Sequence, residues 1–344
     1  MTAISDSLFL RACRREPTER PPAWMMRQAG RYMQEYQEVR AEAGGFLQLC
    51  QNPPLAAKAT LDAQRILQTD AAIIFSDITL PGQAMGLDLS FSPGPVFENP
   101  VRTMADVEAL KSVDPDTDLA PVMEAIRLTR EGLPSDVSLI GFCGAPFTLA
   151  GYMIEGKPGK NWVEMKRMLY GARDVFDAFI DRVVETVIAH ARAQLAAGCD
   201  TVQLFDSNAG ELAPEELRDV AYEATRRCVE GIRALGAPII YFPRGAGAHL
   251  EAAVDVGCDV LAVDWTMDLA DVTERLGKRV GLMGNLDPTA LLADEASVRT
   301  RTHATMEKAR GASGYIFNLG HGILPPTPVP NAKAVIETVR GFRW

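Results

Sequence analysis

The stretch Gly198-Cys199-Asp200-Thr201-Val202-Gln203-Leu204-Phe205 joins the end of a helix to a buried strand, and this junction decides the fold. Ahead of it, apolar residues recur every three or four positions over 176–187, which is typical of a helix with one buried face. Gly198 is the expected helix stop, and the apolar run after it is typical of a strand covered on both faces. The same order of glycine, cysteine and aspartate recurs at 257–259, again ahead of an apolar run.

Apolar runs of this kind recur along the chain, with helical patterns between them. Their positions are 23–26, 72–75, 137–142, 201–205, 239–242, 260–263, 280–283 and 315–317. Strands that alternate with helices pair in parallel, and eight such units favour closure into a barrel. The sequence therefore predicts an α/β fold in which residues 1–344 form a single-domain (β/α)8 TIM barrel with a short N-terminal extension.

The composition is that of an ordinary globular protein and excludes several function classes. Of 344 residues, 47% are hydrophobic and 23% charged, and the net charge of −10 argues against binding to nucleic acid or to an acidic membrane surface. The six cysteines are scattered without metal or redox spacing, which predicts reduced, buried thiols. Without an apolar run of membrane-spanning length or a signal-peptide core, we expect a cytoplasmic protein with no membrane partner.

The segment Trp24-Met25-Met26-Arg27-Gln28-Ala29-Gly30-Arg31-Tyr32 places two arginines four positions apart. If the chain turns helical after Met26, both guanidinium groups lie on one face. Arginine stays charged at working pH and binds carboxylates through two parallel hydrogen bonds, so the pair predicts a site for a ligand with several acidic groups. The alternative is a solvated pair whose aliphatic stems cover the surface.

Further polar residues follow the predicted strands, where a barrel carries its ligand and catalytic groups. They are Asp77, Tyr152, Asp206, Ser207, Asn318 and His321, with Arg40 farther along from the first strand. Each has a purely structural alternative. Asp77 could be a helix N-cap, Tyr152 a core tyrosine, and Ser207 and His321 turn or capping residues.

Familiar cofactor and metal motifs are weak or missing. The glycines at 245–250 do not complete a dinucleotide-binding pattern, and no zinc-ligand spacing is present. The lysine- and glycine-rich segment 156–160 is not a Walker A loop, and we interpret it as a mobile lid or an exposed turn. The sequence favours chemistry that uses neither a metal nor an organic cofactor.

Several segments together carry a resemblance to a known family. They are residues 24–32, 74–78, 141–149, 152–156, 284–288 and 317–323. On these motifs, and over essentially its whole length, the chain resembles the uroporphyrinogen decarboxylase family of haem biosynthesis. The resemblance implies a (β/α)8 barrel that forms a homodimer. It also implies removal of the four acetate carboxyl groups of uroporphyrinogen III, giving coproporphyrinogen III, without metal or organic cofactor.

The resemblance also assigns roles to residues. It implies that Arg27 and Arg31 hold substrate carboxylates and that Asp77 meets the pyrrole NH groups. The implied catalytic set is Asp77, Arg27, Tyr152 and His321, and the implied substrate-binding set is Arg27, Gln28, Arg31, Arg40, Asp77, Tyr152, Ser207 and His321. The proton donor stays open between an arginine, a bound water and His321.

Two rival interpretations remain. Zinc-dependent methyltransferases that act on corrinoid proteins resemble this family in fold, but they need a His-x-Cys pair, and no histidine here has a cysteine two positions on. A barrel that only carries tetrapyrroles would keep the arginines yet could dispense with Asp77. The presence of both favours the enzyme.

Overall fold

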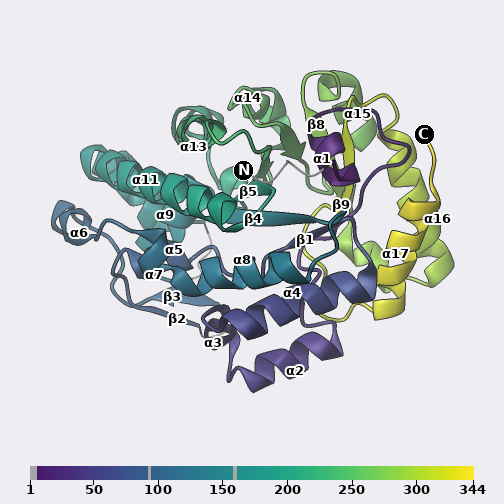
Figure 1. Ribbon diagram of the computed structural model, residues 1–344. Coiled ribbons are helices and arrows are strands. Elements are labelled where there is room, and N and C mark those ends of the chain that lie inside the picture. The colour runs from purple at the N-terminus through teal and green to yellow at the C-terminus, as the bar shows by residue number, and fades with distance from the viewer. Residues whose placement is uncertain (1–5, 92–93, 158–160) are drawn as a thin grey trace.

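The computed structural model describes residues 6–91, 94–157 and 161–344 (Figure 1). Within these ranges the chain forms one mixed α/β unit built around a curled parallel sheet. The first residues of the predicted N-terminal extension, 1–5, lie outside the described residues, and so do residues 158–160 of the predicted lid.

Seven strands form the parallel sheet, in the order β1-β4-β5-β6-β7-β8-β9. They are β1 (Ala71–Ile73), β4 (Ser138–Gly144), β5 (Thr201–Asp206), β6 (Ile239–Pro243), β7 (Val260–Ala262), β8 (Gly281–Leu286) and β9 (Tyr315–Leu319). Each pairs in parallel with its neighbour, so all their carboxyl ends lie at one edge. Seven of the eight predicted strands are confirmed.

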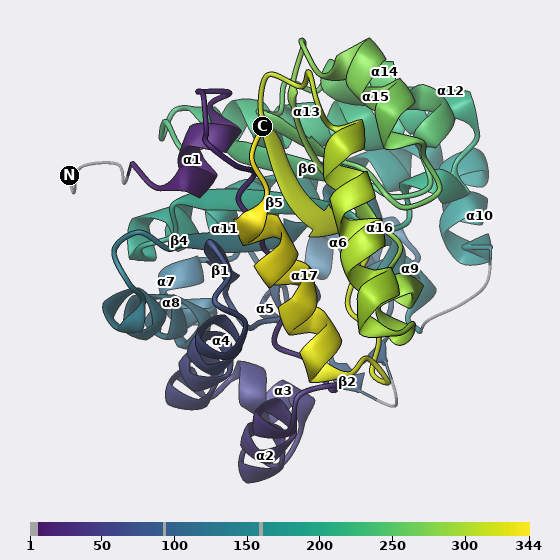
Figure 2. The ribbon, with the colours of Figure 1, turned by 90° about the vertical axis from the view of Figure 1, so that its right-hand side faces the viewer.

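Helices surround the sheet, most of them on its outer face. They are α1 (Leu8–Cys13), α2 (Gln34–Glu42), α3 (Phe46–Cys50), α4 (Pro53–Leu67), α5 (Leu80–Ala84), α6 (Met104–Ala109), α7 (Pro115–Asp118), α8 (Ala120–Gly132), α9 (Pro146–Glu155), α10 (Val163–Gly171), α11 (Arg173–Ala197), α12 (Pro214–Glu216), α13 (Glu223–Arg233), α14 (Leu250–Val254), α15 (Leu269–Leu276), α16 (Glu295–Lys308) and α17 (Val329–Gly341). In Figure 2, α17 lies between α4 and α16 and packs against both. The sequence did not predict the small hairpin of β2 (Leu89–Phe91) and β3 (Pro95–Phe97).

Local chemistry explains the best-predicted helix. The apolar stripe over 176–187 forms the buried face of α11, and Gly198 ends that helix with a φ of 126°. This backbone conformation favours glycine because a side chain would be strained there. No helix in the described parts of the chain is long and apolar enough to cross a bilayer. All six cysteines are buried and free, as expected.

The eighth predicted strand, 23–26, is reduced to a single bridge. Ala23 bridges Phe317 of β9, where the Phe317 amide donates to the Pro22 carbonyl at 2.8 Å and the Trp24 amide donates to the Phe317 carbonyl at 3.3 Å. On the other side, the Asp70 amide donates to the Ala23 carbonyl at 2.9 Å. Eight full strands are therefore not confirmed, because the pairing is a single bridge at Ala23 and turns begin at Met26.

Apolar side chains fill both faces of the curled sheet. Inside the curl lies a cluster that includes Trp24, Phe205, Phe242 and Ile316, all buried. Residues from α1, among them Phe9 and Leu10, belong to the same cluster, so α1 fills one end of the interior. A larger cluster lies between the sheet and the surrounding helices. Functional side chains are thus left to the other end of the sheet.

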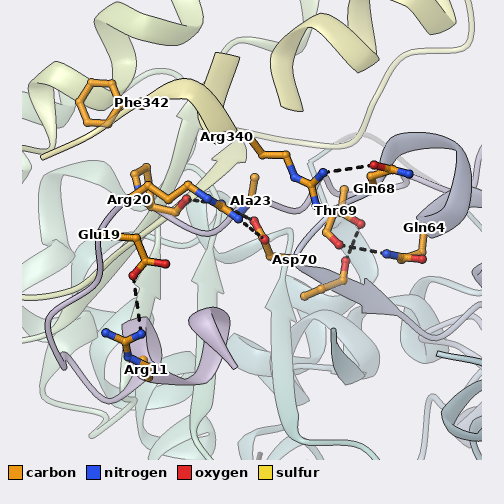
Figure 3. A network of polar contacts seen from close by, with 12 residues as sticks. Arg11, Glu19, Arg20, Ala23, Gln64, Gln68, Thr69, Asp70, Arg340 and Phe342 are labelled. Atoms are coloured by element: carbon orange, nitrogen blue, oxygen red, sulfur yellow. Dashed lines mark hydrogen bonds and ion pairs between the residues drawn. The ribbon is translucent and has the colours of Figure 1, made fainter. Parts of the chain in front are cut away.

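A buried ion pair holds the bridging segment in place (Figure 3). Arg20 donates through Nη2 to Asp70 Oδ1 at 2.7 Å and through Nη1 to Asp70 Oδ2 at 2.8 Å, and the Ala23 amide donates to the same Oδ2 at 2.8 Å. The side chains of Arg20 and Asp70 are only 15% and 10% exposed. Such a two-pronged pair fixes the geometry more tightly than a single contact does.

We expect Asp70→Asn to lower the free energy of unfolding by about 3 kcal/mol, because Arg20 would keep a buried charge without its partner. Urea denaturation at neutral pH measures the loss. Asp177→Asn is the matched control, since Asp177 pairs with Arg173 on the exposed surface of α11 and such pairs contribute little. Equal denaturation midpoints for Asp70→Asn and the control would contradict this account.

Candidate functional site

The segment with the two arginines is a turn and not a helix. Residues 26–32 form consecutive turns and bends, and α2 begins only at Gln34. Arg27 has a φ of 63°, in the left-handed region, which interrupts any helix there. The prediction that Arg27 and Arg31 lie on one helical face is therefore wrong, although both side chains are exposed on the same turn.

Contacts with the segment after β9 position Arg27. The Asn318 side-chain oxygen accepts from the Met26 amide at 3.0 Å, and the Ile323 amide donates to the Met26 carbonyl at 2.9 Å. A Cβ atom on Gly322 would overlap the Arg27 side chain, and one on Gly320 would overlap the Trp265 backbone. The glycines beside His321 are thus needed for close approach.

Arg27 lies among the other predicted catalytic groups. Its side chain reaches solvent, yet the protein atoms around its guanidinium lower its pKa by burial. Tyr152 and Asp77 are near enough to oppose this shift, while Arg31 adds to it. The charge of Arg27 in turn helps to lower the pKa of His321. The structure therefore brings Arg27, Arg31, Asp77, Tyr152 and His321 into one neighbourhood.

Asp77 has one oxygen held by the protein. Its Oδ1 accepts from the amide and the hydroxyl of Thr79 at 2.8 and 2.5 Å, whereas Oδ2 has no hydrogen bond within the described residues. α5 begins after Thr79, which makes no side-chain cap bond, and Asp77 accepts from the amide two residues on in the turn before this helix, so the capping alternative is confirmed in part and takes up only Oδ1. Burial raises the pKa of Asp77, while Thr79 and the charge of Arg27 oppose that rise. Oδ2 is the oxygen left to meet a ligand.

Tyr152 projects from α9 beside Trp162, with ring centroids 5.3 Å apart in an edge-to-face arrangement. Burial raises the pKa of its hydroxyl, and the nearby Asn208 side chain opposes this rise. A tyrosine whose pKa is raised keeps its proton at neutral pH. The hydroxyl can therefore donate a hydrogen bond to an acidic ligand.

His321 lies between two aromatic rings. Its ring centroid is 6.4 Å from that of Phe242 and 6.2 Å from that of Trp265. Burial lowers the pKa of His321 to about 4, and the charges of Arg27 and Arg244 contribute to the decrease. The imidazole is therefore neutral at neutral pH, when it has one donor and one acceptor nitrogen.

The remaining predicted residues are placed differently. Ser207 follows β5 and lines a pocket of about 160 Å³ together with Asn208 and Arg244. The Gln28 side chain is buried, where it accepts from the Met25 amide and donates to the Ala71 carbonyl, both at 3.3 Å. Arg40, on α2, lies with Arg31 near Tyr36.

Asp206 and Asn318, which the sequence also predicted as polar residues after strands, are buried and form hydrogen bonds within the protein. Asp206 is fully buried and accepts from the hydroxyls of Thr148 at 2.6 Å and Tyr241 at 2.9 Å. Burial raises its pKa to about 6. Asn318 is also buried and accepts from the Met26 amide. These two side chains therefore connect elements of the fold.

Sequence reasoning missed Arg244. It directly follows β6, and its charge acts on Arg27, Tyr152 and His321. The rule that located Asp77 and His321, a polar residue just past a strand, applies to Arg244 equally. Asp264 and Trp265, which follow β7, were missed in the same way.

The cationic groups of the site lack acidic partners. Across the described residues no ion pair links Arg27, Arg31, Arg40 or Arg244 to a carboxylate, although most ion pairs of the protein involve arginine. Among the residues that the structure describes, no three histidine, cysteine, aspartate or glutamate side chains lie close enough together to hold a metal ion. In a protein of net charge −10, four unpaired arginines make this a site for an anionic ligand.

Comparison with known proteins identifies relatives over nearly the whole chain. The family model described as "Uroporphyrinogen decarboxylase (URO-D)" matches residues 5–342. A protein of Pelobacter propionicus named uroporphyrinogen decarboxylase is 46% identical over 335 residues, covering 97% of this chain and 98% of its own. A protein of the same name from Trichlorobacter lovleyi is 45% identical over 334 residues, with the same coverage.

Solved structures show a shared fold at lower identity. A methyltransferase from Methanosarcina mazei superposes with a TM-score of 0.80 and is 21% identical, covering 96% of both chains. A putative vitamin-B12 independent methionine synthase from Listeria monocytogenes gives a TM-score of 0.60 at 14% identity, covering 94% of this chain and 97% of its own. At these identities the likeness concerns the fold alone.

The neutral state of His321 predicts a pH dependence of stability. Its pKa of about 4 lies below the usual value of 6.5, so between these two values the unfolded chain binds more protons and stability falls as pH falls. Between pH 7 and pH 4.5, we expect the free energy of unfolding to fall by roughly 2 kcal/mol less in His321→Asn than in the wild type, allowing for partial solvent exposure of the ring.

Urea denaturation at both pH values measures this difference. The matched control is His303→Asn, because His303 is exposed on α16. An equal acid loss in wild type and His321→Asn would show that the ring is not held neutral.

Proposed function

The chain belongs to the uroporphyrinogen decarboxylase family, and on this premise we propose that it converts uroporphyrinogen III to coproporphyrinogen III by removing four acetate carboxyl groups. The protein is then a carboxy-lyase that needs neither metal nor organic cofactor. The observation that carries the proposal is a carboxylate, Asp77, with one free oxygen beside arginines that have no acidic partner.

The arginines suit the charge of the substrate. Uroporphyrinogen carries eight carboxylates, and Arg27 and Arg31 would bind carboxylates at the edge of the macrocycle through charge-assisted hydrogen bonds. Neither guanidinium must first leave a protein carboxylate, since no ion pair holds either one within the described chain. Arg40, near Arg31, would extend the same positive surface.

The pyrrole ring itself would take up the electrons of the reaction. A proton adds to the ring carbon that bears the acetate, which makes the ring cationic. The bond to the carboxyl group then breaks, carbon dioxide leaves, and its electron pair neutralises the ring. A proton then adds to the remaining methylene group while the ring loses the first one, so each acetate becomes a methyl group with net uptake of one proton. Asp77 would stabilise the cationic ring electrostatically through Oδ2.

The other residues would orient the substrate. Tyr152, Ser207 and neutral His321 would hydrogen-bond to further carboxylates, and Gln28 would support the turn from beneath. Because the pKa of His321 is about 4, its imidazole is a poor source of protons at neutral pH. An arginine or a bound water is the better candidate for the proton donor.

The proposal includes the finer features implied by the family. Residues 22–24, with hydrogen bonds to Phe317 and Asp70, would complete a closed (β/α)8 barrel over residues 1–344. The protein would act in the cytoplasm as a homodimer. Sedimentation should then give twice the mass of the 37.4 kDa chain, and a monomer at micromolar concentration would exclude the dimer.

An anaerobic incubation with uroporphyrinogen III tests the activity. With a chelator present and no metal added, we expect products that have lost one to four molecules of carbon dioxide by mass, ending at coproporphyrinogen. Tight binding without any mass loss would instead select the tetrapyrrole carrier.

Asp77→Asn should lower kcat by about 100-fold or more, because the amide keeps an oxygen for Thr79 but removes the charge that stabilises the cationic ring. Steady-state assays with saturating uroporphyrinogen measure this loss. Asp88→Asn, at an exposed position, serves as the control and should react at the wild-type rate. Near-normal turnover by Asp77→Asn would remove Asp77 from the mechanism.

A further inference from the structure

Arg244 is a further cation of the candidate site, and no sequence motif assigned it a role. We call the space next to Arg27, Asp77, His321 and Arg244 the cleft. It follows β6 directly, and its guanidinium donates to the Ser207 carbonyl at 3.4 Å and lies 5.7 Å from the centre of the Trp265 ring. A guanidinium over an indole ring is held there by cation–π attraction. Arg244 is thus positioned by neutral groups, a backbone carbonyl and an indole ring.

The carboxylates that line the same pocket form no ion pair with Arg244. Asp264 lines the same pocket, but its Oδ2 accepts from the Gly245 amide at 2.7 Å and its Oδ1 accepts from the amide and hydroxyl of Thr266. Glu211, also at this pocket, is exposed and forms no ion pair with Arg244. Neither carboxylate accepts a hydrogen bond from Arg244, whose donors other than the one directed at the Ser207 carbonyl are left for a ligand from outside the chain.

The pocket beside Arg244 offers further hydrogen-bonding groups. Ser207 and Asn208 line it, and the buried Asn208 Nδ2 lies near the Tyr152 hydroxyl but has no acceptor at hydrogen-bonding geometry in the described part of the chain. A buried donor without an acceptor is costly, so an acceptor from a ligand or water is expected there. The volume of about 160 Å³ leaves room for several groups of the size of a water molecule.

We propose that Arg244, with Trp265 beneath it and Asn208 beside it, binds a carboxylate side chain of the substrate on the side of the cleft formed by the loops after β5, β6 and β7. This assignment rests on the proposed function, because it names a contact for the same macrocycle. Arg27 and Arg31 come from the other end of the strand order, before β1. The cleft therefore holds the macrocycle by cations from two sides.

Kinetics of Arg244→Gln test the proposal. Loss of one charge-assisted, two-pronged contact should raise KM for uroporphyrinogen by roughly 10- to 100-fold with much less change in kcat. Arg244→Lys should recover part of the affinity, because it keeps the charge without the fork. The control for net charge is Arg301→Gln, an exposed position on α16 without an ion pair among the described residues, which should leave KM unchanged.

Inhibition by coproporphyrinogen identifies the side chain that is bound. The acidic side chains of the product are all propionates. An equal loss of affinity for substrate and product in Arg244→Gln therefore assigns a propionate to Arg244. A loss confined to the substrate assigns an acetate. Unchanged values for both, in a variant that denatures at the wild-type urea concentration, would overturn the inference.

A measurement on the ligand-free protein separates this inference from the proposed function. Because Arg244 helps to lower the pKa of His321, Arg244→Gln should move the NMR titration of the His321 ring to higher pH. An unmoved titration would place Arg244 away from the cleft. Absence of turnover by the wild type would reject the proposed reaction, whereas normal turnover with unchanged KM in Arg244→Gln rejects only the role of Arg244.

Discussion

The carboxylate of Asp70 is the contact on which the rest of the site depends. It binds the Arg20 guanidinium and the Ala23 amide at once, and so it ties the bridging segment to the start of β1. From that fixed point the chain runs only a few residues before the left-handed turn at Arg27. A short, firmly held lead leaves Arg27 little freedom to move relative to Asp77, which follows β1 itself. The geometry between cation and carboxylate is thus set by the edge of the sheet.

The distribution of charge explains how an acidic protein keeps an anion site. On the helices, arginines pair with carboxylates, as Arg226 does with Glu223 and Arg299 with Glu295. In the cleft, the nearby carboxylates are occupied by other donors: Thr79 holds one oxygen of Asp77, and backbone amides hold Asp264. In the described residues these arginines therefore form no ion pair with a protein carboxylate. The site can attract an anion even though the net charge of the protein is negative.

The sequence predicted what local chemistry controls and missed what tertiary contacts control. Buried strands and the helix stop at Gly198 follow from apolar runs and backbone preference, and seven strands and α11 agree with that prediction. The condition that the chain turns helical after Met26 is not met, since Arg27 takes the left-handed conformation and Asn318, far along the chain, binds the Met26 amide. Asp206 ends β5 and Ser207 follows it, yet only Ser207 lines the pocket, since successive side chains of an extended chain point to opposite faces. Only the folded chain showed that Gly322 makes room for Arg27.

The plug formed by α1 has a consequence for how a macrocycle moves through the protein. With Phe9 and Leu10 packed into one end of the sheet interior, a macrocycle would enter and leave at the opposite end, where the carboxyl ends of the strands lie. A substrate that loses a carboxyl group from each of its four pyrrole rings would therefore either turn within the site between reactions or dissociate and bind again from the same side. Partly decarboxylated intermediates would then compete with substrate for the same site. The rates of dissociation and rebinding, as well as the rate of decarboxylation, would determine which intermediates accumulate in solution.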